Sequence, residues 1–176
     1  MKTNTGLVEL PVKTTDGEFI ARYSESGLVE IDFPNARRAS SRIATKGVVP
    51  PKIRGWHRLI QASLKKVLAG RAAGELPPLD WSGKTEFQKS VWRELRKISL
   101  GKTKSYGEIA EAIGKPKAVR AVGNACGANP IPVLVPCHRV LAANNQLGGY
   151  SSGLERKRRL LAGEGIDLGK AHRDPG

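Results

Sequence analysis

The sequence predicts two domains, a small α/β domain over residues 1–83 and a mostly helical domain over residues 84–170. Three observations support this fold class. Short apolar runs separated by turn sequences indicate strands near the amino terminus. Helical spacing with a glycine-containing break indicates a helix-turn-helix pair in the second half. A proline-rich apolar run then ends in adjacent cysteine and histidine residues, which directs the search for chemistry to the second domain.

The first domain is expected to combine three strands with one helix. The predicted strands cover residues 7–12, 19–23 and 28–33. In the third run, Val29, Ile31 and Phe33 alternate with acidic residues, so one face is apolar and the other polar. Apolar residues then follow helical spacing over 56–68, and residues 76–81 look like an edge strand that leads to a linker. No catalytic constellation is visible in this domain, so we expect it to support the second one.

The charge of the chain favours a polyanionic partner. Its net charge is +14, from 30 Lys and Arg residues against 16 Asp and Glu residues. The excess is +5 up to Gly83 and +9 after it. Cations that neutralise phosphates release counterions, so nucleic acid is the favoured partner. The basic loop over residues 34–52 is open to two interpretations, of which a solvated surface is more common than a DNA contact.

Several classes of protein and of site are excluded by what the sequence lacks. Cys126 and Cys137 are the only cysteines and form no Cys-x-x-Cys pair, and the three histidines are scattered. A disulfide scaffold and a metal site are therefore not expected. The amino terminus lacks the apolar core of a signal peptide, and no segment reaches the ~20 apolar residues that span a bilayer. We expect a monomer without membrane partners, in the cytoplasm or associated with the nucleoid.

The second domain is expected to begin with three helices. Thr85 is a suitable N-cap for the first, which should end at Gly101. Ser105 caps a second helix over 106–113, and a tight break precedes a third helix over 117–128. The buried stripe of the first helix is predicted to consist of Phe87, Val91, Leu95 and Ile98.

The third helix has an unusually smooth face. Its apolar side is predicted to consist of Val119, Val122 and Cys126. Its small and polar residues, which are candidates for DNA contact, include Ala118, Ala121, Gly123, Asn124 and Ala125. Glycine costs a helix about 1 kcal/mol relative to alanine, so this face suits close approach to a DNA groove or to another helix, and both remain open. Arg120 on this face could enter a base stack in place of an extruded base.

The stretch over residues 131–140 contains a short β-branched run that Pro132 and Pro136 bracket. This run is expected to be extended, because proline restricts its own backbone and that of the residue before it. The run leads to Cys137 and His138 at its end. A thiol is a nucleophile only as the thiolate, and an adjacent base helps to form that anion. Cys126 is open to two interpretations, a buried packing thiol or a second reactive one.

The string from Pro136 to Val140, together with Asn129-Pro130 and Gly149-Tyr150-Ser151, resembles the active-site signature of the O6-alkylguanine-DNA alkyltransferases. Further motifs of this family occur in order between residues 85 and 165. The resemblance implies a ribonuclease-H-like N-terminal domain followed by a winged-helix DNA-binding domain. Some members hold zinc in the N-terminal domain, but this chain has no cysteine before Cys126, so no metal is expected.

The resemblance also implies a reaction and its partner. An alkyl group passes irreversibly from O6 of guanine, in double-stranded DNA, to Cys137, with one turnover per molecule and no cofactor. His138 takes the thiol proton and Glu164 orients His138. Asn129 acts as a hinge, with a helix C-cap as its alternative role.

The remaining roles concern the flipped base and the gap that it leaves. Tyr106 and Lys157 are expected to assist the leaving guanine, and the spacing of Lys157 from Leu154 and Leu161 points it inward. Residues expected to bind the substrate are Tyr150, by stacking, Ser151, through its amide, Val140 and Cys137, through their carbonyls, and Arg120, which fills the gap.

Three other functions compete with alkyl transfer. A relative that binds lesions without transfer would lack the cysteine, which is present here. A Cys-His hydrolase with turnover would need an oxyanion hole, for which the basic helix-turn-helix context gives no reason. A transcription factor would explain the helices but not Pro136-Cys137-His138-Arg139. The tail over residues 171–176 is expected to be flexible.

Overall fold

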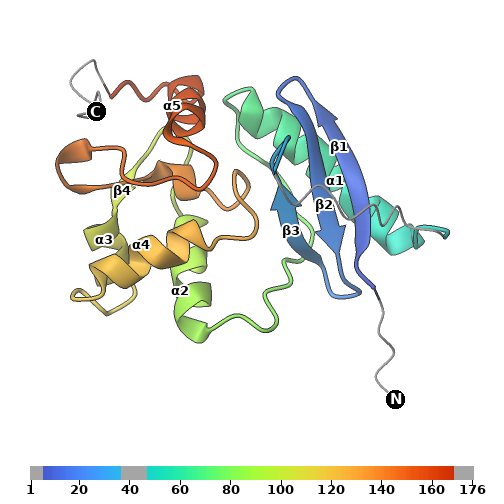
Figure 1. Cartoon of the computed structure of the whole chain (residues 1–176), viewed down its shortest axis with the longest axis horizontal. Coiled ribbons are helices and arrows are strands. Elements are labelled where there is room, and N and C mark those ends of the chain that lie inside the picture. Colours follow the sequence, from blue (N-terminus) through green and yellow to red (C-terminus); the bar gives the residue numbers. More distant parts are fainter. Residues whose placement is uncertain (1–5, 37–46, 169–176) are drawn as a thin grey trace. The chain divides into compact units, whose positions relative to one another are not determined.

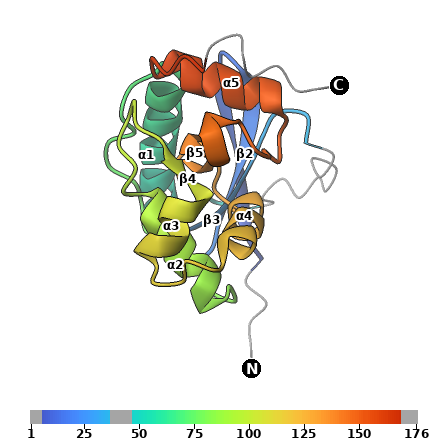
Figure 2. The ribbon, with the colours of Figure 1, turned by 90° about the vertical axis from the view of Figure 1, so that its left-hand side faces the viewer.

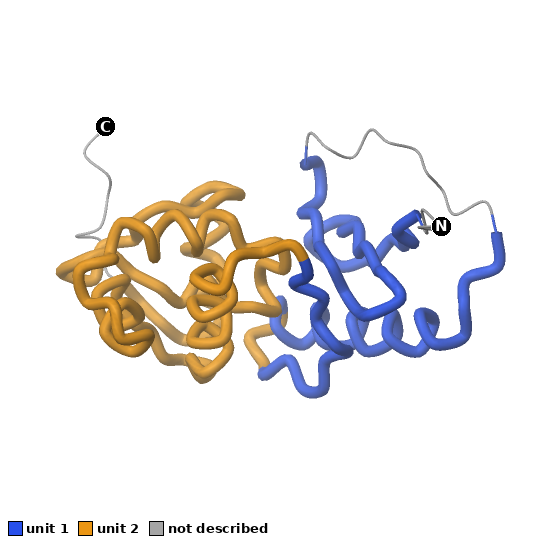
Figure 3. The backbone as a smooth tube through the Cα atoms, turned by 90° about the horizontal axis from the view of Figure 1, so that it is seen from below, with its two compact units in different colours: residues 1–68, 72–82 blue, residues 69–71, 83–176 orange. Residues whose placement is uncertain are grey.

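The computed structural model describes residues 6–36 and 47–168. Most of the predicted basic loop and the predicted flexible tail lie outside these ranges. The chain divides into two compact units, the first containing residues 1–68 and 72–82 and the second containing residues 69–71 and 83–176 (Figure 3). Within the described ranges no helix combines the length and the apolar character that a membrane span requires.

The first unit is a three-stranded antiparallel sheet with one helix packed against it (Figure 1). Its elements are β1 (Val8–Thr14), β2 (Gly17–Tyr23), β3 (Leu28–Asp32) and α1 (Pro51–Leu68). The sheet order is β1-β2-β3, so the three predicted strands and the helix are confirmed. Apolar side chains of β2, including Phe19 and Tyr23, and of α1, including Ile60 and Leu64, form the core.

The predicted edge strand over residues 76–81 is wrong. Only Leu79 forms a bridge, a parallel one to Leu28. The amide of Leu28 donates to the carbonyl of Pro78 at 2.9 Å, and the amide of Asp80 donates to the carbonyl of Leu28 at 2.8 Å. The two prolines in this segment lack the amide hydrogens that a longer ladder would need, which explains why pairing stops there.

The polar face of the sheet carries a cluster that the alternating pattern does not reveal. Arg22 of β2 is almost fully buried and donates to Glu9 at 2.7 Å, to Asp32 at 2.6 Å and to Glu30 at 3.1 Å. The acidic residues of β3 therefore neutralise a buried cation. A buried charge is tolerated only when it is paired in this way.

Up to residue 168, where the described part ends, the second unit contains four α-helices, two 3-10 turns and a two-stranded parallel sheet. Its elements are α2 (Glu86–Leu95), β4 (Lys104–Ser105), α3 (Tyr106–Ala112), α4 (Val119–Gly127), η1 (Cys137–Arg139), β5 (Val140–Leu141), η2 (Ala143–Asn145) and α5 (Leu154–Gly163). Helices α2, α3 and α4 pack together, while β4 pairs with β5 (Figure 2).

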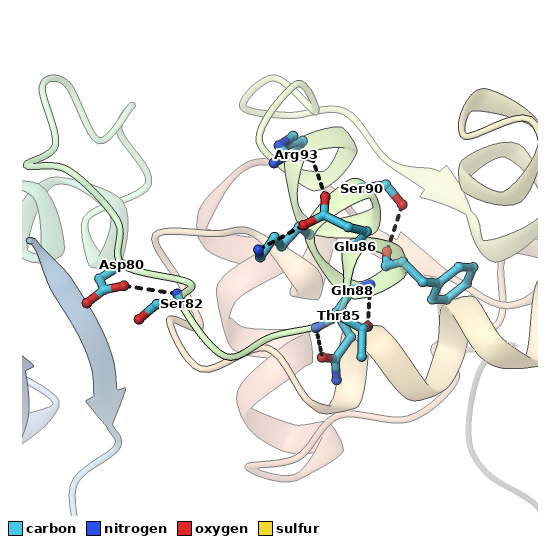
Figure 4. Close-up of polar contacts among 9 residues, drawn as sticks. Asp80, Ser82, Thr85, Glu86, Gln88, Ser90 and Arg93 are labelled. Carbon is cyan, nitrogen blue, oxygen red and sulfur yellow. Dashed lines mark hydrogen bonds and ion pairs between the residues drawn. The ribbon is translucent and has the colours of Figure 1, made fainter.

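Capping boxes fix where two of these helices begin. Thr85 accepts from the amide of Gln88, whose side chain accepts from the amide of Thr85 (Figure 4). Ser105 and Glu108 repeat this arrangement at α3. Both predicted N-caps are confirmed, and each satisfies amides that a helix start leaves without partners.

The buried stripe of α2 is confirmed for Val91 and Leu95, whereas Phe87 is only half buried. The helix ends at Leu95 and not at Gly101, so Ile98 is buried but lies beyond the helix. The larger anchor of this helix is Trp92, which is fully buried. Its indole nitrogen donates to the carbonyl of Ala125 at 2.8 Å and so joins α2 to α4.

The expectation of an extended run between Pro132 and Pro136 is wrong, because residues 131–135 form a buried turn and Cys137–Arg139 form a 3-10 turn. The amide of Val135 donates to the carbonyl of Ile131 at 2.9 Å, and Val133 has φ of +72°, in the left-handed region. The side chain of Asn129 holds this turn closed, because its Nδ2 donates to Val135 O at 2.8 Å and its Oδ1 accepts from Ile131 N at 3.0 Å. These short-range hydrogen bonds override the preference for extended backbone in residues that precede proline.

The left-handed backbone at Val133 gives a testable prediction. This region costs an L-residue about 1–2 kcal/mol, and only glycine avoids the cost. Val133→Gly and Val133→Ala both lose a buried side chain, so both should destabilise the protein. The glycine variant should nevertheless be more stable than the alanine variant by about 1 kcal/mol, as measured by urea unfolding.

The control is the same pair of substitutions at Val135, which is also buried but has no positive φ. At that position alanine should be the more stable replacement, which is the usual order. If alanine were the more stable replacement at Val133 as well, the backbone at Val133 would carry no strain.

Candidate active site

The candidate nucleophile and base lie on η1, directly after the buried turn. The side chains of Cys137 and His138 are both almost inaccessible to solvent. Burial raises the pKa of the Cys137 thiol, although contacts with the Asn129 side chain and the charge of Lys157 oppose it. The resting thiol is therefore protonated, so nucleophilic attack requires a group that takes its proton.

Glu164 fixes the orientation of His138. Nε2 of His138 lies 2.8 Å from Oε1 of Glu164, which caps the C-terminus of α5. Burial opposes ionisation of this carboxyl group, but hydrogen bonds from His138 and Arg139 outweigh burial and lower its pKa to about 2. An ionised carboxylate only accepts hydrogen bonds, so Nε2 must be the donor.

This donation leaves the other ring nitrogen as the basic atom. Nδ1 of His138 is buried and has no hydrogen-bond partner in the described part of the chain. Burial also lowers the pKa of His138, which favours the neutral ring despite the opposing effect of Glu164. A neutral imidazole with its proton on Nε2 presents a free lone pair at Nδ1, which can accept a proton.

Arg139 is a site residue to which the sequence analysis gave no role. Its Nε donates to Oε2 of Glu164 at 2.8 Å, and its Nη2 donates to Oε1 at 2.9 Å. Its Nη1 donates to the carbonyl of Ile98 at 2.6 Å. The only available signal was its place in the string Pro136-Cys137-His138-Arg139, which does not reveal the partner.

Lys157 points inward, as its helical spacing predicts, and is fully buried. Its Nζ donates to the carbonyls of Val140 at 2.7 Å, of Gly149 at 3.3 Å and of Leu147. Burial lowers its pKa to about 8, against the opposing effects of Cys137 and Cys126. All three ammonium hydrogens therefore hold backbone carbonyls, and one of these is the Val140 carbonyl that was expected to contact a base.

Tyr106, at the start of α3, approaches the loop before α5. A Cβ atom at Gly148 would lie 3.0 Å from the Tyr106 ring, and Gly148 has φ of +67°. Glycine is therefore required there both by space and by backbone conformation. Burial raises the pKa of Tyr106 to about 12, with further contributions from Cys126 and Cys137, so this phenol keeps its proton.

The same loop carries the two residues expected to bind a base. Tyr150 is partly buried. Burial is the main reason why its pKa lies well above the usual value, and Cys137 contributes a smaller rise. Ser151 is exposed. Tyr150 therefore lies near enough to Cys137 for the two groups to influence each other's ionisation, whereas Ser151 is accessible at the surface of the unit.

Cys126 of α4 is buried. Burial raises the pKa of its thiol to about 12, with a further rise caused by Cys137. A thiol with this pKa is almost entirely protonated at neutral pH and is a poor nucleophile. These properties favour the interpretation of Cys126 as a packing thiol.

The face of α4 is open in the second unit. Arg120, Ala121 and Asn124 are exposed, and a Cβ atom at Gly123 would meet no atom within 4 Å. Ala118 precedes the helix and is half buried. These residues are the accessible members of the predicted DNA surface.

Two residues of α4 lie differently from their predicted positions. Ala125 is buried and its carbonyl accepts from Trp92, so its side chain faces the interior of the unit and not the open face. Val119 was expected on the apolar side, but it is 42% exposed. Val119 is the first residue of α4, and the buried side of the helix begins at Val122, almost one turn later.

No three His, Cys, Asp or Glu side chains within residues 6–36 and 47–168 are grouped as metal ligands. The expectation that the protein uses no metal and no cofactor stays a prediction.

Comparison with known proteins places these residues in a family. Residues 86–166 match the family described as "6-O-methylguanine DNA methyltransferase, DNA binding domain". A methylated-DNA–protein-cysteine methyltransferase from Mycolicibacterium paratuberculosis is 51% identical over 118 residues, which cover 64% of this chain and 71% of that protein. A protein of the same name from Methanosarcina acetivorans is 56% identical over 96 residues, which cover 53% of this chain and 62% of that protein.

A solved structure extends the similarity to both units. The crystal structure of Mycobacterium tuberculosis OGT in complex with DNA matches with a TM-score of 0.71 and 38% sequence identity. The match covers 88% of this chain and 90% of that one. The chain therefore belongs to the family of the methylated-DNA–protein-cysteine methyltransferases.

Proposed function

We propose that this protein repairs O6-alkylguanine in double-stranded DNA by transferring the alkyl group irreversibly to Cys137, once per molecule. The observation that carries the proposal is that a buried thiol and His138 are neighbours on η1, where Nε2 of His138 is held by Glu164 and Nδ1 has no hydrogen-bond partner among the described residues. This is the arrangement of nucleophile, base and orienting group that activates a weak nucleophile. The family membership of the chain supports the same reaction.

The proposed reaction begins with proton removal. The thiol proton passes to Nδ1 of His138, directly or through one water molecule. The thiolate sulfur then bonds to the alkyl carbon as the bond from that carbon to O6 breaks, and the electron pair stays on the guanine. Burial keeps Tyr106 protonated at neutral pH, and Tyr106 is proposed to donate its proton to the leaving base.

The proposed role of Lys157 follows from its three hydrogen bonds. These bonds hold the loop over residues 147–149. The positive charge of Lys157 also favours the Cys137 thiolate, while Tyr106 is proposed to supply the proton. The thioether that forms on Cys137 has no route back to the thiol. One turnover per molecule is therefore expected, without a cofactor.

The lesion must leave the base stack before it can reach a buried cysteine. The open face of α4 suits close approach to the minor groove, and exposed Arg120 on that face can replace the extruded base. Tyr150 is proposed to stack on the flipped base, and the amide of Ser151 is proposed to contact its O6. Asn129 holds the turn that leads from α4 to Cys137.

The proposed fold of the second unit is a winged-helix domain over residues 84–170, with α3 and α4 as the helix-turn-helix pair. The element order α2, β4, α3, α4, η1, β5, in which β4 pairs with β5, suits this fold. The sheet and helix of residues 1–83 suit a ribonuclease-H-like supporting domain. Each proposed site residue comes from one chain, so a monomer suffices, and a DNA substrate implies action in the cytoplasm or at the nucleoid.

The first prediction of this proposal concerns Cys137. After reaction with duplex DNA that contains one O6-methylguanine, intact mass should rise by one methyl group, and peptide mapping should place it on Cys137. Cys137→Ala should bind the DNA but show no mass increase, because the sulfur acceptor is missing. Mass spectrometry at increasing DNA excess should show saturation at one methyl group per protein.

Cys126→Ala is the matched control, since it removes the other buried thiol of the same unit. It should retain full transfer. Methylation of Cys126 would show that Cys137 is not the nucleophile and that the proposal names the wrong residue. Tight lesion binding with unchanged mass would instead indicate a recognition protein.

The second prediction concerns Arg120. Because flipping a base costs a few kcal/mol, Arg120→Ala should slow transfer from duplex DNA by about tenfold or more. Its reaction with free O6-benzylguanine should stay close to the wild-type rate, since no base has to be flipped. Single-turnover kinetics with both substrates provide the comparison.

Arg93→Ala serves as the control because Arg93 is an exposed arginine of α2 and its removal changes the net charge equally. It should affect the two substrates alike. If Arg120→Ala slowed both substrates equally, Arg120 would support the site itself and not the flipped state.

A further inference from the structure

The buried guanidinium of Arg139 shares an oxygen of Glu164 with His138. Oε1 accepts from Nε2 of His138 at 2.8 Å and from Nη2 of Arg139 at 2.9 Å. Oε2 accepts from Nε of Arg139 at 2.8 Å. The side chain of Glu164 is 1% exposed and that of Arg139 is 9% exposed, so water screens these contacts very little.

We propose that Arg139 is a positioning residue that holds Glu164 in one orientation and limits the pull of its carboxylate on the proton of His138. This inference rests on the proposed function. The proposal gives Arg139 a role in the reaction although its hydrogen bonds go to Glu164 and Ile98 and not to the Cys137 thiol or the His138 ring. Arg139 acts only through the carboxylate that it shares with His138.

The physical reason lies in the balance of charge around His138. Burial disfavours the charged ring, while Glu164 favours it, and the cations Arg139 and Lys157 disfavour it again. Cys137 lies beside His138 on η1 and carries a protonated thiol at rest. Without Arg139, the full charge of a buried carboxylate would act on the imidazole alone.

The consequence concerns Nδ1. A ring that is already protonated carries hydrogen on both nitrogens and cannot accept the thiol proton. By dividing the carboxylate charge, Arg139 keeps His138 neutral in the resting protein and so keeps Nδ1 free. The base is then competent at the pH at which the thiol itself is still protonated.

The geometry explains why an arginine stands at this position. Its planar fork reaches both oxygens of Glu164 while Nη1 donates to the carbonyl of Ile98 at 2.6 Å. A lysine carries the same charge as a single point and cannot hold both oxygens in one plane. Substitution of Arg139 by lysine, which keeps the charge, or by glutamine, which removes it, can therefore separate the effect of its charge from its effect on the orientation of Glu164.

A purely structural role is the competing explanation. The bonds of Arg139 also join the end of α5 to the carbonyl of Ile98, which follows α2. If joining these segments were its whole role, loss of Arg139 would lower stability and slow transfer equally at every pH. The proposed role instead predicts a change in the pH dependence of transfer.

The test is single-turnover transfer from duplex DNA carrying O6-methylguanine, measured between about pH 5 and pH 9, a range that spans ordinary histidine titration. Arg139→Gln removes the charge, so the acid limb of the rate profile should move to higher pH by about one unit. Arg139→Lys keeps the charge, so its limb should stay near the wild-type position while the plateau rate falls. Arg93→Gln removes an exposed arginine charge and should leave the profile unchanged.

A second readout is independent of transfer. Nitrogen-15 NMR of the histidine rings should show His138 in the wild-type protein as neutral, with its proton on Nε2, at neutral pH. The titration of His138 should move upward in Arg139→Gln but not in Arg139→Lys. His138→Gln assigns the signal among the three histidines.

The outcomes separate the two proposals. No transfer by the wild-type protein would overturn the proposed function. Wild-type transfer with an unmoved acid limb in Arg139→Gln would overturn the role of Arg139 alone. If Arg139→Gln does not fold, the wild-type NMR titration still decides, because a doubly protonated His138 at neutral pH contradicts the proposal.

Discussion

The carboxylate of Glu164 is the group on which the arrangement of the site depends. It is buried and ionised, so it must receive hydrogen bonds from charged or polar donors. His138 and Arg139, neighbours on η1, supply them, and Arg139 also binds the carbonyl of Ile98. Leaving a buried charge without its partner is costly, so this single requirement places η1 against the end of α5 and the segment after α2.

Burial also determines how the nucleophile is controlled. The Cys137 thiol is protonated at rest because an apolar environment disfavours the thiolate. Such a thiol resists oxidation and adventitious alkylation, which depend on the thiolate and on access. In the proposed reaction the thiol depends on His138 for activation, and the free lone pair at Nδ1 follows from the hydrogen bond at Nε2. Cys126 shares the burial but is not adjacent to a base, which fits a packing role.

The backbone around η1 is held as firmly as its side chains. Asn129 closes the turn before Cys137, and Val133 in that turn adopts a conformation that a β-branched residue rarely takes. After η1, Lys157 binds three carbonyls and fixes the course of the loop that carries Tyr150. These hydrogen bonds are made to backbone amides and carbonyls, which every residue type carries, so the sequence does not predict them.

The sequence by itself determined the strands and helix of the first unit, both capping boxes, the inward direction of Lys157 and the family. These depend on local periodicity, on short-range hydrogen bonds and on a contiguous motif. Only the three-dimensional structure decided the turn at 131–135, the burial of Ala125 and Arg22, and the partner of Arg139. The turn is closed by hydrogen bonds of the Asn129 side chain, which hydrophobic periodicity does not predict. The others depend on contacts between residues farther apart in the chain, such as Arg139 and Glu164, which no local pattern reveals.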